Sequence, residues 1–214
     1  YTYAQIESIN SFNTLKKLDI KTRLFGRIGT SSPFESSLYL AGANQEEMLN
    51  NDFTKADAFF PVDWYGYGAE INHLQMSGGL NLRGYAGYLA PEVSEGEIIY
   101  TYRGNSGLSA SMEVDFDKFI PLNPKFTRNW LHIDSYLFGD IGSMVYQNLS
   151  NETLLGSVRA DAGIGTAFTF KKLPFNIYKP ITIRFDVPFL INPSTYTQPE
   201  QLEFRYVLGI NRSF

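Results

Sequence analysis

The segment KLDIKTRLFGRI, residues 17 to 28, alternates between apolar and charged side chains and decides the fold. Successive side chains on a β-strand point to opposite faces, so residues of one parity share one face. The apolar parity holds Leu18, Ile20, Leu24 and Ile28. The opposite parity holds Lys17, Asp19, Lys21, Arg23 and Arg27. A strand over these residues has one apolar face and one densely charged face.

Outward from this segment, the same alternation recurs at residues 107 to 119, 131 to 147, 157 to 168, 181 to 190 and 202 to 214. No apolar stripe at helical spacing competes with it. We therefore predict strands near residues 1–12, 15–30, 98–119, 130–147, 153–171, 178–191 and 201–214, of which the first alternates poorly. A long loop is expected over residues 31–97, with a short helix around EEML at residues 46 to 49.

The composition supports an all-β chain and excludes several other classes of protein. Of the 214 residues, 15% are aromatic, and aromatic residues favour strands and membrane interfaces. The net charge of −4, without a cluster of Lys or Arg, argues against a nucleic-acid partner. The absence of cysteine excludes disulfides and Cys-based zinc sites, and no apolar run is long enough for a membrane helix.

Two architectures are built from such alternating strands. A soluble sandwich packs its apolar faces in a dry core, whereas a transmembrane barrel turns them to lipid and lines an aqueous lumen with polar faces. The strands expected here exceed the roughly 5 to 6 residues of an ordinary strand. Their apolar faces end in Phe116, Phe189 and Phe214, and their polar faces carry both charge signs. These features favour an antiparallel transmembrane β-barrel with outer-membrane lipid as a partner. Six or seven strands are too few to close it, so we expect the C-terminal part of a larger barrel.

Three further groups of residues stand out along the chain. The stretch LNLRGY at residues 80 to 85 contains Arg83, Gly84 and Tyr85. The stretch FGDIG at residues 138 to 142 contains Phe138, Asp140 and Gly142. The last expected strand contains Phe204, Tyr206, Gly209 and Phe214.

Together with SMEVDF at residues 111 to 116, these stretches resemble the BamA/TamA superfamily of outer-membrane assembly barrels, the bacterial surface antigen type. The resemblance covers residues 15 to 214 and implies a sixteen-stranded barrel of the bacterial outer membrane, with a long loop folded into its lumen. It implies a role in inserting or translocating proteins. The implied partners are client outer-membrane proteins and periplasmic or lipoprotein accessory subunits, and no cofactor is implied.

Strand parity suggests partners for the loop arginine. Asp140 and Glu113 lie on the polar parity of neighbouring strands, so an arginine delivered into the lumen would meet two carboxylates. A planar guanidinium can bind a carboxylate bidentately, which an ammonium group cannot do. We therefore expect Arg83 to bridge Asp140 and Glu113. The alternative is an ordinary turn at Arg83 and two solvated lumen charges.

The neighbouring residues carry three smaller expectations. Gly84 is expected to allow a tight or positive-φ turn, and Gly78 and Gly79 a close approach to the barrel wall. Tyr85 is expected to stack on a lumen aromatic such as Phe138.

The loop departs from the assembly-factor pattern, because residues 43 to 75 intervene before its glycine pair. This insertion is similar to barrels that Bacteroidetes-type bacteria append to zinc-aminopeptidase-like proteins. The alternative function is therefore a barrel that anchors or exports an upstream zinc-metallopeptidase-like domain.

No catalytic constellation is apparent in the chain. It contains no nucleophile elbow, phosphate-binding loop or HExxH motif, and its two histidines, His73 and His132, lie far apart in sequence. We expect no catalytic residues, no metal site and no cofactor, and hence no enzymatic activity in this segment.

Overall fold

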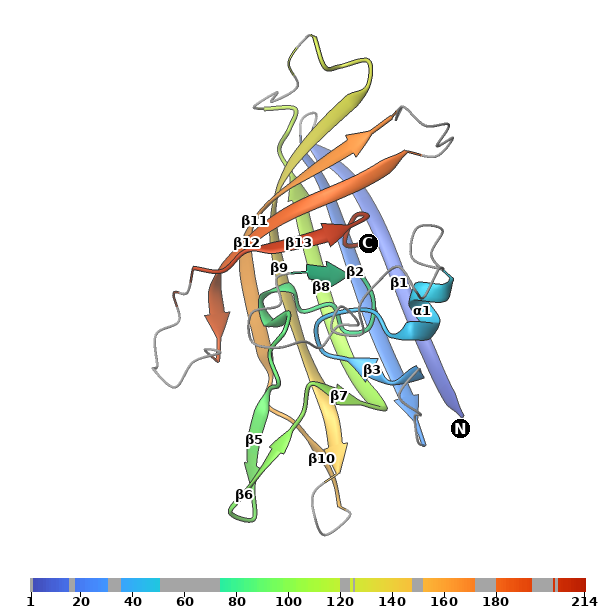
Figure 1. The fold of residues 1–214 in the computed structure, drawn as a ribbon, viewed down its shortest axis with the longest axis vertical. Coiled ribbons are helices and arrows are strands. Elements are labelled where there is room, and N and C mark those ends of the chain that lie inside the picture. Colours follow the sequence, from blue (N-terminus) through green and yellow to red (C-terminus); the bar gives the residue numbers. More distant parts are fainter. Residues whose placement is uncertain are drawn as a thin grey trace.

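The computed structural model describes residues 2–15, 18–30, 36–50, 74–119, 124, 126–147, 152–171, 180–193, 202 and 204–214. Its dominant feature is one curled, mostly antiparallel sheet that forms a half-barrel, shown in Figure 1. The long strands form the curved wall, and part of the segment between residues 38 and 90 packs inside the curve. The expectation of a chain built mainly from β-strands is confirmed.

The wall is built from strands that follow one another almost in chain order, and all but the last have ten or more residues. They are β1 (Tyr3–Leu15), β2 (Leu18–Gly29), β8 (Ser106–Asp115), β9 (Leu131–Gln147), β11 (Arg159–Phe170), β12 (Ile181–Asn192) and β13 (Val207–Ile210). Each pairs antiparallel with its neighbour in this order. The short strand β4 (Leu74–Met76) then pairs with β13 in parallel.

The remaining described elements are short. They are β3 (Leu38–Tyr39), α1 (Gln45–Leu49), the 3-10 turn η4 (Arg83–Tyr85), β5 (Pro91–Ser94), β6 (Glu97–Tyr100), β7 (Arg103–Gly104) and β10 (Thr153–Leu155). β3 pairs with β7, β5 forms a hairpin with β6, and β10 pairs with β9. The expected helix around EEML is α1. It begins at Gln45 because Asn44 caps it and shares a capping box with Glu47.

The strand boundaries differ from the expected ones in four places. The stretch 98–119 breaks into β6, β7 and β8, and the stretch 153–171 breaks into β10 and β11. The poorly alternating first segment forms the full-length edge strand β1. The last stretch contracts to β13, which ends before Asn211, where φ is 67°. Earlier in the stretch, Leu202 makes an isolated bridge to Leu190. The long loop, 31–97, contains β3, α1, β4, η4 and β5.

Burial follows the parity of the strands, with apolar residues outside. On β2, Leu24 and Ile28 are 56% and 77% exposed, whereas Arg23 and Arg27 are 3% exposed each. The same inversion recurs on β8, β9, β11 and β12, where the outward residues include Leu108, Leu137, Ile164 and Ile183. The buried inward residues include Glu113, Asp140, Asp161 and Arg184. The wall is therefore apolar on its convex face and ionic on its concave face.

The apolar core lies inside the half-barrel and comes largely from the loop. Its buried members include Leu38, Leu40, Leu80, Leu82 and Tyr85, which pack against Phe25, Met144, Ile191 and Val207 of the wall. Burying these side chains favours a folded loop against the concave wall. None of the helices in the described ranges has the length and apolar content needed to cross a bilayer.

Candidate functional site

Arg83 contacts inward-facing side chains of the wall and is fully buried. Its Nε donates to Asp140 Oδ2 at 2.7 Å and its Nη2 donates to Asp140 Oδ1 at 3.0 Å, which is a bidentate contact. Its Nη1 donates to Glu113 Oε1 at 2.7 Å. The structure therefore brings together the arginine and both carboxylates that strand parity suggested. We call this group, Arg83 with Asp140 and Glu113, the loop lock.

Phe138 contacts Arg83 and not Tyr85, which was expected to stack on it. The guanidinium carbon of Arg83, not the Tyr85 ring, lies 4.0 Å from the centroid of Phe138. Tyr85 instead contacts Tyr88, with ring centroids 5.9 Å apart, and its hydroxyl donates to the carbonyl of Pro193 at 2.9 Å. Phe138 thus covers the cation, which strengthens the ionic group in a region that water does not reach.

Gly84 is needed for close approach rather than for an unusual backbone angle. It lies in the tight 3-10 turn η4, which is one of the two expected alternatives. The positive φ values nearby are at Gly78, Gly79, Asn81 and Gly87, not at Gly84. A Cβ on Gly84 would lie 2.7 Å from the Cβ of Asp161 on β11. The turn therefore packs directly onto the wall, which only glycine permits.

The glycine pair before the motif approaches a different surface from the one expected. Gly78 and Gly79 have φ values of 154° and 55°. Added Cβ atoms would meet Ala43 at Gly78, and the carbonyls of Tyr39 and Gly42 at Gly79. The pair therefore packs against another part of the loop, residues 39 to 43.

Three wall arginines that the sequence did not single out as loop contacts bind loop carbonyls. Arg205 donates to the carbonyls of Gly84 and Ala86 at 2.5 and 2.6 Å. Arg23 donates to the carbonyl of Gly79 at 2.9 Å, and Arg27 donates to that of Ser36 at 2.5 Å. Their polar parity was visible in the sequence, but carbonyl acceptors leave no sequence signature. The loop is thus held from β2 at one side and from the start of β13 at the other.

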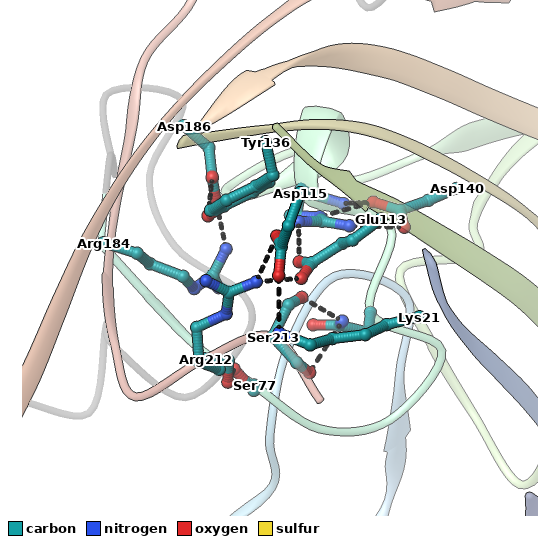
Figure 2. Close-up of polar contacts among 12 residues, drawn as sticks. Lys21, Ser77, Glu113, Asp115, Tyr136, Asp140, Arg184, Asp186, Arg212 and Ser213 are labelled. Atoms are coloured by element: carbon teal, nitrogen blue, oxygen red, sulfur yellow. Dashed lines mark hydrogen bonds and ion pairs between the residues drawn. The ribbon is translucent and has the colours of Figure 1, made fainter. Parts of the chain in front are cut away.

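Arg212, near the end of the chain, shares the carboxylate of Glu113 with Arg83. Its Nη2 donates to Glu113 Oε2 at 2.8 Å and to Asp115 Oδ1 at 2.9 Å, and its guanidinium lies over the ring of Tyr136 (Figure 2). Burial opposes the charged form, yet Glu113 and Asp115 raise the pKa of Arg212 above its ordinary value. Glu113 therefore bridges two arginines, Arg83 from the loop and Arg212 from the end of the chain.

A second buried ionic group lies beside the first. Arg184 on β12 contacts Asp186 and the side chain of Gln75 on β4, and the hydroxyl of Tyr136 donates to Asp186 at 2.6 Å. Gly209 lies directly beneath Arg184, so that an added Cβ would overlap the guanidinium. Gly209 is therefore required where β13 passes under this side chain.

The other residues singled out in the sequence are more distant from Arg83. Gly142 pairs with Ser109, and an added Cβ would meet the carbonyl of Leu108 at 2.8 Å. Phe204 and Tyr206 point outward and are 84% and 38% exposed. Phe214 does not lie on the outward apolar face, where the alternation placed it. It lines an inner cavity of about 300 Å³ with Arg23 and Glu47, because the chain turns at Asn211.

One described cluster has the side chains of a metal site. Ligand atoms of Asp117, His132 and Asp134 lie within 4.8 Å of one another. His132 pairs with Asp134 at 2.9 Å, and Arg212 approaches the same carboxylate at 3.5 Å. Arg212 already partly neutralises Asp134, one of the two carboxylates on which a metal would depend. The other histidine, His73, lies outside the described residues.

The geometry of this site is that of a contact between the loop and the wall. Its charged groups are paired with one another and hold a loop to a wall. Comparison of the chain with known protein families, with curated proteins and with solved structures found no match.

Proposed function

We propose that this chain is part of a bacterial outer-membrane β-barrel of the BamA/TamA type, acting in the insertion or translocation of proteins. The observation that carries the proposal is the buried loop lock. Arg83 is delivered by a loop into the concave face, where it binds Asp140 bidentately and Glu113 through a third hydrogen bond. This contact joins two short motifs that the resemblance connects, although they lie on separate elements.

The membrane part of the proposal rests on the inverted burial of the wall. Strands of 12 to 17 residues, such as β2, β9, β11 and β12, exceed the roughly 9 to 11 residues that a tilted strand needs to cross a bilayer. Their outward side chains are apolar, and turning Lys or Arg outward at the midplane would cost about 2 to 4 kcal/mol. Lipid is the solvent that favours this arrangement over water.

A complete barrel needs more strands than the described half-barrel contains. Sheet edges do not persist in the hydrocarbon region, so the convex wall requires strands from elsewhere in the full-length protein. A sixteen-stranded barrel supplies them. The proposed partners are outer-membrane lipid, client outer-membrane proteins, and periplasmic or lipoprotein accessory subunits.

Depletion of the full-length protein tests the assembly role. Loss of the protein should lower the amounts of other folded outer-membrane proteins, measured by quantitative proteomics of the outer-membrane fraction. Re-expression of the native protein should restore them, and re-expression of Arg83→Ala should not. Unchanged outer-membrane protein levels after depletion would contradict this role.

A second candidate function is favoured by the covered edge of β13. β4 pairs with the side of β13 that would otherwise accept an incoming strand. A barrel closed in this way suits an anchor or exporter of an upstream zinc-metallopeptidase-like domain. The expected result is a chelator-sensitive peptidase activity of the full-length protein that leaves the membrane fraction when residues 1–214 are deleted. Absence of any such activity would reject this candidate.

A further inference from the structure

The edge of β13 is covered by a strand from the protein's own loop. β4 pairs with it in parallel, with Leu74, Gln75 and Met76 opposite Leu208, Gly209 and Ile210. It is a three-residue pairing, and the only parallel one among the described strands of this sheet. Parallel pairs are somewhat less stable per residue than antiparallel ones, and a short pair has few hydrogen bonds to lose. This is the weakest strand junction of the described wall.

Side chains next to β4 hold it beside the end of the chain. Ser77 donates to the carbonyl of Arg212 at 2.9 Å, and Asn81 donates to the hydroxyl of Ser213 at 2.6 Å. Met76 packs with Ile210 in a small buried cluster. Residues 74 to 81 thus run beside residues 208 to 213. We expect all of these contacts to break together when the two segments come apart.

The loop lock is connected to this junction through Glu113. One carboxylate oxygen accepts from Arg83, and the other accepts from Arg212. Removing Arg83 leaves Glu113 and Asp140 as buried carboxylates with fewer cations, which is strongly unfavourable without rearrangement. Arg83 is also only two residues from Asn81, so its release loosens the segment that carries β4.

We propose that β4 is a displaceable guard strand, which covers the edge of β13 while the loop lock is closed and exposes it when Arg83 is released. The exposed edge would accept an antiparallel strand with apolar residues toward lipid, because the outward residues Tyr206 and Leu208 continue the apolar face of β12. This inference goes beyond the proposed function, because it concerns closure of the edge under either candidate.

Thiol labelling of Met76→Cys in the full-length protein tests the release. Met76 is 4% exposed, so a cysteine there should react slowly with a maleimide while β4 is in place. Adding Arg83→Ala should raise the labelling rate at least about tenfold, because it breaks a buried ion pair. Arg159→Ala is the matched control. Arg159 is only 2% exposed but pairs with Glu92 of β5, so this variant should leave the rate nearly unchanged.

Folding of each variant is checked by heat-modifiable migration in gels. If Arg83→Ala does not fold, Arg83→Lys, which keeps the charge but loses the bidentate contact, replaces it. Equal labelling rates in the Arg83 and Arg159 variants would overturn the proposal.

A disulfide between Met76→Cys and Ile210→Cys tests whether the edge of β13 binds another strand only when β4 can leave it. The probe is a synthetic peptide of residues 181 to 192, the sequence of β12, the antiparallel neighbour of β13. A photo-crosslinker at position 208 should capture this peptide in the Arg83→Ala background with the thiols reduced, and the oxidised disulfide should abolish capture. An oxidised Phe12→Cys/Ile20→Cys pair, which joins β1 to β2, should leave capture intact. Capture that is equal with and without the β4 disulfide would overturn the proposal. Neither readout depends on outer-membrane protein levels. Failure of this inference can therefore be told apart from failure of the assembly role.

Discussion

Arg83 and Asp140 are joined by two side-chain hydrogen bonds of 2.7 and 3.0 Å, although they lie 57 positions apart in the chain. The pair connects a loop to the longest strand of the wall, and both side chains are fully buried. A buried pair of this kind contributes little net stability over an apolar packing, but removing one partner is costly. Its main effect is to specify where the loop lies inside the half-barrel.

Replacing Arg83 with Lys should open the loop lock without removing its charge. An ammonium group cannot make the bidentate contact with Asp140 and reach Glu113 together, so we expect a loss of about 1 to 3 kcal/mol from hydrogen bonds left unmade. Limited proteolysis of the full-length protein should then cut the 74–90 segment faster. Arg103→Lys, at an exposed position in β7, is the control. Equal cleavage of the two variants would show that the bidentate contact does not hold the loop.

Gly84→Ala should destabilise the loop through overlap with the wall. The new Cβ would lie 2.7 Å from the Cβ of Asp161, and overpacking of this kind costs about 1 to 3 kcal/mol. The unfolding midpoint in detergent should fall accordingly. Gly139→Ala is the matched control, because its nearest neighbour would be at an ordinary 3.8 Å. A midpoint shift as large for Gly139→Ala would argue against the close approach as the cause.

Leu137→Arg distinguishes lipid from water outside the wall. Leu137 is 50% exposed on the convex face of β9. In water this change should stay within about 0.5 kcal/mol, whereas at the bilayer midplane it should cost about 2 to 4 kcal/mol. We expect reduced insertion of the variant into lipid vesicles, measured by heat-modifiable migration. Val93→Arg, at the exposed β5–β6 hairpin, should insert normally. Normal insertion of Leu137→Arg would contradict the membrane proposal.

Glu47 should make the loop more stable at low pH. Burial raises the pKa of the Glu47 carboxyl above 4.5, although hydrogen bonds from the backbone of Asn44 and Gly79 and the charges of Arg23 and Arg27 oppose the shift. The folded state then binds a proton more tightly than the unfolded state, so this stability is present at low pH and is lost as the pH rises through the folded pKa. Glu47→Gln should flatten the dependence of the free energy of unfolding on pH, measured in unfolding experiments at several pH values. Glu46→Gln, one position earlier in α1, should leave the slope in place, and a slope that persists in Glu47→Gln would assign it to another group.

Strand positions and faces were predictable because they depend on local alternation. The parity of residues 17 to 28 correctly placed Arg23 and Arg27 inside and Leu24 and Ile28 outside. The contact between Arg83, Asp140 and Glu113 was also predictable, because parity put both carboxylates on one face and charge supplied the partner. Interruptions of strands, such as the turn at Asn211, carried no comparable local signal.

The sequence by itself determined which faces of the wall are apolar and ionic, because side-chain direction on a strand repeats every two residues. Only the tertiary structure decided which backbone groups those faces bind. Arg205 takes the carbonyls of Gly84 and Ala86, Phe138 faces Arg83 instead of Tyr85, and β4 covers β13. These contacts depend on how closely separate segments approach one another in space. Every residue except proline offers the same backbone carbonyl and N–H, so no residue pattern distinguishes the ones that are used.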